Sequence, residues 1–175
     1  LKMVLRVGAD LWHMCAQAGM MPGFRFPGTD SATFLSPGLM AQAVGIEGGN
    51  AWIYVDGKGK RYINELIRTT HGYVNLNSVW RPQPLPVPAF LIFDEAVRLS
   101  GPLMPPIAAG WGSEVLGYQW SRDNSEEIAK GWIVQADTIA ELAAKIEISP
   151  AALQNTVDRF NMFCILENDA DFGRP

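Results

Sequence analysis

The chain has 175 residues, of which 48% are apolar and 18% are charged, and its formal net charge is −4. This balance is typical of a globular domain and excludes an intrinsically disordered chain. The lysines and arginines are scattered, whereas nucleic-acid binding needs clustered basic residues. No apolar run approaches the roughly 20 residues that span a bilayer. We therefore expect neither nucleic acid nor a membrane among the partners.

The cysteines and histidines favour no metal site and no disulfide framework. Cys15 and Cys164 are too few and too far apart for either arrangement. We expect two buried thiols in a reducing cytoplasm. His13 and His71 have no ligand partner at metal spacing, so no metal is expected.

The first 50 residues divide into a helix and a loop-rich stretch. Residues 1–20 are predicted to be helical, because apolar residues recur at steps of three and four, namely Val4, Val7, Leu11 and Met14. Residues 21–50 are rich in Gly, Pro, Ser and Thr and are predicted to be loops with one short helical turn. Leu1 lies inside the helical run without a cap, and the chain stops just after another helical segment. We therefore expect a piece of a longer protein.

A β-hairpin is the clearest local prediction. Residues 51–55 have the composition of a strand, residues 56–60 that of a tight turn, and residues 61–64 that of the returning strand. Gly57 and Gly59 fit the turn because glycine tolerates positive φ.

The middle of the chain contains a short strand and a short helix. Residues 65–75 have only weak helical periodicity, and four prolines between Pro82 and Pro88 predict an extended connector. Residues 89–93 are predicted to be a strand, with Asp94 as the N-cap of a helix over 95–99. Residues 100–124 are predicted to be mostly loop.

Two helices are predicted near the C-terminus, after a short extended piece at 133–136. The first begins at a capping box formed by Thr138 and Glu141 and has one apolar stripe: Ile139, Leu142, Ala143 and Ile146. The second begins at Ser149-Pro150 and has its own apolar face: Leu153, Val157, Phe160 and Cys164. Strands separated by helical blocks indicate an α+β fold.

Five segments resemble the fumarate reductase/succinate dehydrogenase flavoprotein family. We count the ketosteroid dehydrogenase-like branch as part of this family. Gly57–Glu65 is similar to the family's G-K-R-F-x-N-E stretch, and Leu91–Arg98 to its I-F-D-x-x-x-R stretch. Ala136–Ala143 resembles A-D-T-x-x-E-L-A. Leu153–Arg174 resembles L-x-x-T-V-x-R-F-N … D-x-D-F-G-R. Gly8–Met14 also resembles G-A-x-L-W-x-M, in the helix that leads into the cap.

The resemblance implies an FAD-dependent oxidoreductase that reduces or forms a C=C bond next to a carboxylate or carbonyl, as fumarate reductase does. In this family a capping domain closes over a flavin domain. Residues 1–22 then form the helix leading from the flavin domain, and 23–175 form the substrate-facing cap. The implied partners are the FAD-binding domain of the same parent chain and a small unsaturated acid or ketone. The phosphate-binding G-x-G-x-x-G turn after a strand is missing here. We therefore expect the isolated chain to be inactive, to bind no FAD, and to self-associate through its uncovered apolar surface.

The resemblance also assigns a catalytic group. Arg98 matches the family's proton-donating arginine, and Glu65 and Arg68 match a carboxylate and an arginine that relay protons to it. A guanidinium acts as an acid only when it is desolvated and reprotonated through such a chain, because its free pKa exceeds 12. From the residues alone, Glu65 and Arg68 also fit a surface ion pair, and Arg98 fits a solvated arginine.

Two alternatives remain open. The connector between Arg68 and Arg98 is long, and His71, Tyr73 and Trp80 lie near it, as in the ketosteroid dehydrogenase branch. In that case an aromatic hydroxyl such as that of Tyr73 performs the proton chemistry. The other alternative is a non-catalytic binding or interaction module with the cap fold.

Overall fold

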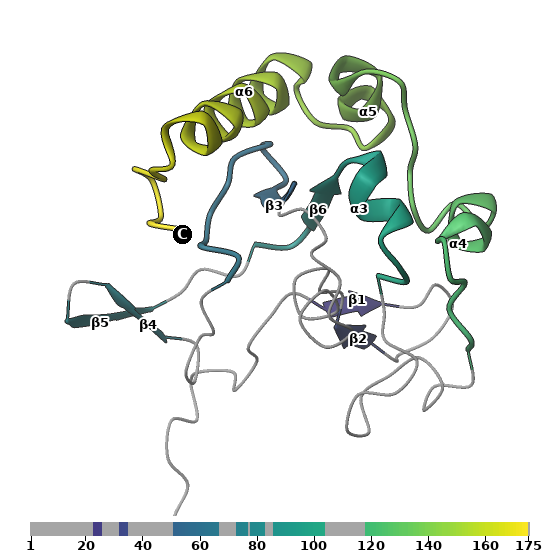
Figure 1. Ribbon diagram of the computed structural model, residues 1–175, viewed down its shortest axis with the longest axis horizontal. Helices are drawn as coiled ribbons and strands as arrows, with labels where there is room; N and C mark the ends of the chain where they lie inside the picture. The colour runs from purple at the N-terminus through teal and green to yellow at the C-terminus, as the bar shows by residue number, and fades with distance from the viewer. Residues whose placement is uncertain are drawn as a thin grey trace, which may run out of the picture.

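The computed structural model describes residues 23–25, 32–34, 51–66, 73–76, 78–82, 86–103 and 118–174. These contain both strands and helices, as predicted (Figure 1). The strands are β1 (Gly23–Arg25), β2 (Ala32–Phe34), β3 (Trp52–Asp56), β4 (Tyr73–Leu76), β5 (Val79–Pro82) and β6 (Ala89–Phe93). The helices are α3 (Glu95–Leu99), α4 (Ser125–Ala129), α5 (Ile139–Lys145) and α6 (Pro150–Leu166). The helix predicted over residues 1–20 lies outside the described residues.

The centre of the fold is the antiparallel pair β3–β6, in which Trp52 lies opposite Phe93 and Asp56 opposite Ala89. The first four residues of β3 are all buried. Because successive side chains of a strand point to opposite faces, both faces of this pair must be covered.

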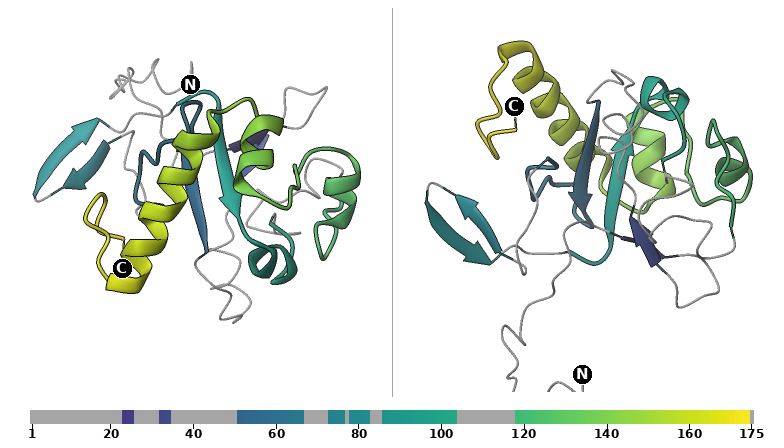
Figure 2. Two further views of the ribbon diagram at one scale, coloured as in Figure 1. Left: turned by 90° about the horizontal axis from the view of Figure 1, so that it is seen from above. Right: turned by 60° about the horizontal axis from the view of Figure 1, so that its bottom comes forward.

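Helices α5 and α6 cover one face of the pair. Figures 1 and 2 show the two helices over β3 and β6, with the β4–β5 hairpin projecting away. Ile53, Val55 and Ile92 form a hydrophobic cluster with residues of the two helices and their connection: Ala143, Ile148, Leu153 and Phe160. Burial of this apolar area holds the two C-terminal helices on the sheet.

The opposite face carries an aromatic cluster. Trp52 and Tyr54 pack edge to face, with ring centroids 5.5 Å apart. Val97 of α3, Leu103 and Trp120 complete the cluster from later parts of the chain. This second core joins α3 and the segment that precedes α4 to the same two strands.

The predicted hairpin over 51–64 forms only its first strand and its turn. The Asp56 N–H donates to the Lys60 carbonyl at 2.9 Å, but the returning segment makes a single bridge between Val55 and Arg61. At Tyr54 the backbone N–H donates instead to the Glu65 carboxylate at 3.2 Å. The prediction of a second strand was therefore wrong, because a buried side chain takes the hydrogen bond that a strand would have made.

The turn itself is anchored on α6. Gly59 has φ of +76°, and a Cβ atom there would lie 2.8 Å from Cγ2 of Ile148 and 3.2 Å from the Leu153 amide nitrogen. The Thr156 hydroxyl donates to the Gly59 carbonyl at 2.6 Å. Glycine is therefore needed here both for its backbone conformation and for the close approach to the helix.

Two further expectations differ from the structure. The loop predicted over 21–50 contains the antiparallel strands β1 and β2. The end of the weak helix over 65–75 belongs to β4, which pairs with β5, and Ser78 in their connection has φ of +66°. In both cases pairing between neighbouring segments overrides local composition.

All three predicted helix caps are confirmed. Asp94 accepts from the Val97 N–H at 2.9 Å, Thr138 from the Glu141 N–H at 3.1 Å, and Ser149 from the Ala152 N–H at 3.4 Å. The buried face of α6 ends at Phe163, whereas Cys164 is exposed, so the prediction of a buried thiol there was wrong. In the part of the chain that the structure describes, no helix has the length and apolar character needed to cross a membrane.

Candidate functional site: a cavity beside β6

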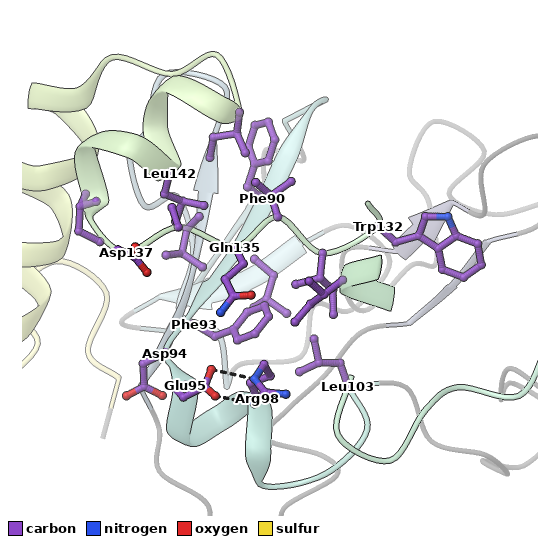
Figure 3. Close-up of a pocket in the computed structure, with 18 of the residues that line it drawn as sticks. Phe90, Phe93, Asp94, Glu95, Arg98, Leu103, Trp132, Gln135, Asp137 and Leu142 are labelled. Carbon is purple, nitrogen blue, oxygen red and sulfur yellow. Dashed lines mark hydrogen bonds and ion pairs between the residues drawn. The ribbon is translucent and has the colours of Figure 1, made fainter. Parts of the chain in front are cut away.

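A cavity of about 740 Å³ lies between β6, α3 and the segment that leads into α5 (Figure 3). Most of its wall is aromatic or aliphatic. The apolar side chains include Phe90, Phe93, Leu103, Trp120, Trp132 and Leu142. Such a volume and lining are typical of pockets that enclose a small organic molecule.

The charged groups at the cavity are one arginine and three carboxylates: Arg98, Asp94, Glu95 and Asp137. Arg98 binds Glu95 through two hydrogen bonds, Nε to Oε2 at 2.7 Å and Nη2 to Oε1 at 2.5 Å. Its Nη1 donates to the Asp123 carbonyl at 2.6 Å. The hydrogen bonds to Glu95 raise the pKa of Arg98 and lower that of the Glu95 carboxyl. The guanidinium therefore remains charged and is largely neutralised by its partner.

Asn124 holds α3 in place beside the cavity. It is fully buried, and its amide nitrogen donates to the carbonyls of Arg98 and Gly101 at 2.7 and 2.9 Å. Its side-chain oxygen accepts from the Leu103 N–H and from Nε1 of Trp120 at 2.9 and 2.7 Å. One side chain thus ties the end of α3 to two residues of the cavity wall.

Gln135 approaches the cavity from the segment before α5. Its backbone carbonyl accepts a hydrogen bond from Nζ of Lys145 at 2.7 Å. Its carboxamide extends into the cavity toward Phe93 and the Glu95–Arg98 pair (Figure 3). Sequence reasoning missed Gln135 and Asn124, because neither lies in a recognisable motif and only the fold brings Gln135 to this wall and Asn124 behind it.

Glu65 lies in a different environment, a buried network of charges. Both of its oxygens accept from Arg61, at 3.0 and 2.8 Å, and Oε2 also accepts from Arg174 at 3.2 Å. Arg61 in turn binds both oxygens of Asp169, at 3.2 and 3.0 Å. Arg174 donates to the Trp52 carbonyl at 2.6 Å. The network therefore ties the C-terminal segment to β3 and to the turn that follows it.

The electrostatics of this network reflect burial and pairing. Burial lowers the pKa of Arg61, but the bonds to Glu65 and Asp169 raise it by more. Burial by itself would raise the pKa of Asp169, but the hydrogen bonds and charge of Arg61 lower it by more, so the pKa of this carboxyl is lowered. The pKa of Arg174 is lowered, chiefly by burial. Burial also raises the pKa of the neighbouring Tyr62 hydroxyl to about 12.

The described residues of the predicted proton relay, Arg98 and Glu65, lie in different parts of the structure. Arg98 lines the cavity, whereas Glu65 is absent from the described cavity wall and is bound to Arg61 and Arg174. Among the described residues no hydrogen bond joins Glu65 to Arg98. Arg68 lies outside the described residues, as does His71. Tyr73 is half-buried on β4. Catalytic roles for Arg98, Glu65 and Arg68 remain predictions.

The turn after β3 does not fit an FAD phosphate site. The glycine-containing turn after β3 is filled by its own side chain, since Oδ1 of Asp56 accepts from the N–H groups of Lys58 and Lys60 at 2.9 Å each. Gly59 packs directly against α6. A pyrophosphate needs free backbone N–H groups at a helix N-terminus. Across the described residues, no cluster of three or more His, Cys, Asp or Glu side chains has the arrangement of a metal site.

Two curated relatives are similar to much of this chain. The chain is 33% identical to a 3-oxosteroid 1-dehydrogenase of Mycobacterium tuberculosis over 129 residues, which make up 70% of this chain and 20% of that protein. It is 31% identical to a 3-oxosteroid 1-dehydrogenase of Mycolicibacterium smegmatis over 129 residues, with the same shares. The chain therefore spans about a fifth of the length of these relatives. No protein-family model matches it.

The fold is also similar to part of a solved structure, 3-ketosteroid delta1-dehydrogenase from Sterolibacterium denitrificans in complex with 1,4-androstadiene-3,17-dione. The TM-score is 0.56 with 21% identity, and the match covers 98% of this chain and 28% of that chain. At this identity the similarity concerns the fold.

Proposed function

We propose that this chain is the substrate-facing part of an FAD-dependent oxidoreductase that acts on a CH–CH bond next to a ketone, as the names of its relatives indicate. The proposal is supported by similarity to 3-oxosteroid 1-dehydrogenases over 70% of the chain. It is also supported by a shared fold with part of a 3-ketosteroid delta1-dehydrogenase. The FAD belongs, in this proposal, to another part of the parent protein.

The charge of the cavity wall is the observation that favours a ketone over a dicarboxylate. The described wall carries three carboxylates and one guanidinium, and Glu95 already binds that guanidinium through two hydrogen bonds. Like charges repel each other, although solvent weakens the repulsion here because Asp94, Glu95 and Asp137 are exposed. A dicarboxylate such as fumarate would therefore be disfavoured, whereas a neutral ketone would gain from the surrounding aromatic and aliphatic surface.

The hydrogen bonds between Arg98 and Glu95 also bear on the role of Arg98. A proton donor works best when its pKa lies near the operating pH, but the bonds to Glu95 move the pKa of Arg98 upward. Within the proposal, Arg98 anchors Glu95 and shapes the cavity. The proton step next to a ketone is assigned to a tyrosine hydroxyl, and Tyr73 is the candidate that the sequence offers.

The test is a substrate comparison on the full-length parent protein. Purified protein with bound FAD would be given a 3-ketosteroid and an artificial electron acceptor. In a separate assay it would receive fumarate and a reduced dye. We expect turnover of the ketosteroid and little reduction of fumarate. The opposite preference would overturn the proposal and restore the fumarate reductase-like alternative.

Variants of the full-length protein separate the two assignments of the proton step. We expect Tyr73→Phe to lower kcat by about 10²–10⁴-fold, the usual size of general acid–base catalysis. Arg98→Ala should lower kcat far less. A loss of that size in Arg98→Ala, with flavin reduction by an artificial donor intact, would instead support Arg98 as the acid.

A further inference from the structure

We infer that Gln135 orients the ligand of the cavity beside β6, by donating a hydrogen bond from its carboxamide to a ketone oxygen of a neutral polycyclic molecule. The ligand class rests on the proposed function. The role of Gln135 rests on the geometry of the described residues around it.

The backbone of Gln135 is held by α5. Nζ of Lys145 reaches back from the last turn of that helix and donates to the Gln135 carbonyl at 2.7 Å. The capping bonds at Thr138 and Glu141 fix the start of the same helix three residues later. This segment therefore has a defined path although it forms neither helix nor strand, and its side chains project from a fixed backbone.

The carboxamide of Gln135 is one of the polar side-chain donors at the described wall, where the hydroxyls of Tyr54 and Thr138 also lie. The Arg98 guanidinium donates to Glu95 and to the Asp123 carbonyl, and the Thr138 oxygen accepts the capping bond from the Glu141 N–H. The three carboxylates offer acceptors, which a ketone oxygen does not bind. Within the described part of the chain the Gln135 carboxamide makes no hydrogen bond, and it extends toward Phe93 (Figure 3). An amide donor next to an aromatic surface suits a rigid apolar molecule with a ketone at one end.

The first test uses the 175-residue chain and 1,4-androstadiene-3,17-dione as the probe. Binding would be followed by equilibrium dialysis and by quenching of tryptophan fluorescence, because Trp120 and Trp132 line the cavity. We expect Gln135→Leu to weaken binding about fivefold, in the range of one lost hydrogen bond. Gln154→Leu, the same change on the exposed side of α6, should leave the dissociation constant unchanged. Circular dichroism would check that both variants are folded.

The second test uses two analogues of the probe, each with one ketone replaced by a methylene group. We expect Gln135→Leu to have no effect on the affinity for one of them, and that analogue identifies the ketone that Gln135 binds. The inference would be overturned if Gln135→Leu weakened the binding of the dione and of both analogues by the same factor. It would also be overturned if the dione did not bind the chain, or if Gln135→Leu and Gln154→Leu bound the dione equally well.

Failure of the inference differs from failure of the proposed function. If the full-length enzyme oxidises the ketosteroid while Gln135→Leu changes KM no more than Gln154→Leu does, the inference is wrong and the function stands. If the full-length protein leaves ketosteroids unchanged while the dione binds the chain through Gln135, the function is wrong and the binding site stands.

Discussion

Among the described residues, the arginine–glutamate pairs Arg61–Glu65 and Arg98–Glu95 have the same chemistry in opposite surroundings. The side chains of Arg61 and Glu65 are 4% and 0% exposed, and Asp169 and Arg174 complete a closed network around them. The side chains of Arg98 and Glu95 are 17% and 59% exposed, at a cavity. A buried pair depends on every partner because water cannot replace one that is lost, whereas an exposed pair can separate and be rehydrated. The first pair therefore serves folding, and the second is available to a ligand.

Removing the charge of the buried pair should have the largest effect on stability. Glu65→Gln leaves Arg61 and Arg174 buried without their shared carboxylate, which we expect to lower the free energy of unfolding by about 3–5 kcal/mol. Urea denaturation of the 175-residue chain would measure it. An unchanged denaturation midpoint would show that the two pairs do not differ as described, and would return Glu65 to its predicted role in a proton relay.

The turn beside the buried network should respond strongly to a single methyl group. Gly59→Ala requires φ near +76° and brings Cβ within 2.8 Å of Ile148, so we expect a loss of about 1–3 kcal/mol in the free energy of unfolding. Gly57→Ala is the matched control, because the atom nearest to its new Cβ, Cγ of Pro88, would lie at an ordinary 3.6 Å. Equal denaturation midpoints for the two variants would contradict the close packing of this turn on α6.

Acid should weaken the buried network through Asp169. The pKa of this carboxyl is lowered in the folded chain, so its contribution is complete above the unfolded value of about 3.9 and is lost as pH falls through the folded value. We expect the free energy of unfolding to decline below about pH 4, and to decline less steeply in Asp169→Asn. Denaturation at a series of pH values would measure both slopes. Parallel curves would mean that other carboxylates account for the decline.

The pair at the cavity should contribute least to stability. Glu95→Gln removes an exposed carboxylate, which water can replace beside Arg98, so the urea midpoint should stay within experimental error of the parental value. In the full-length protein the same change frees the Arg98 guanidinium, and weak binding of dicarboxylates should increase. A large loss of stability in Glu95→Gln would show that the Arg98–Glu95 pair contributes to folding as the Arg61–Glu65 pair does.

Local chemistry explains which predictions were confirmed. The caps at Asp94, Thr138 and Ser149 depend on residues within three or four positions of each other, so the sequence contains the whole interaction. The strands β3 and β6 were predicted for the same reason, since their apolar runs are bounded by turn and cap residues. The prediction for Cys164 was wrong because it placed the thiol on the apolar face that Phe163 completes.

The partners of these elements were decided by the tertiary structure. The sequence by itself determined where helices begin, which strands are apolar and which family the motifs resemble. It did not determine that β3 pairs with β6 rather than with residues 61–64, because Glu65 reaches the Tyr54 N–H only in the folded chain. Arg61 and Asp169 are 108 residues apart, and the Gln135 carboxamide extends toward the Glu95–Arg98 pair only because the fold places both at one cavity. Contacts at such separations follow from packing and burial, which local sequence patterns do not specify.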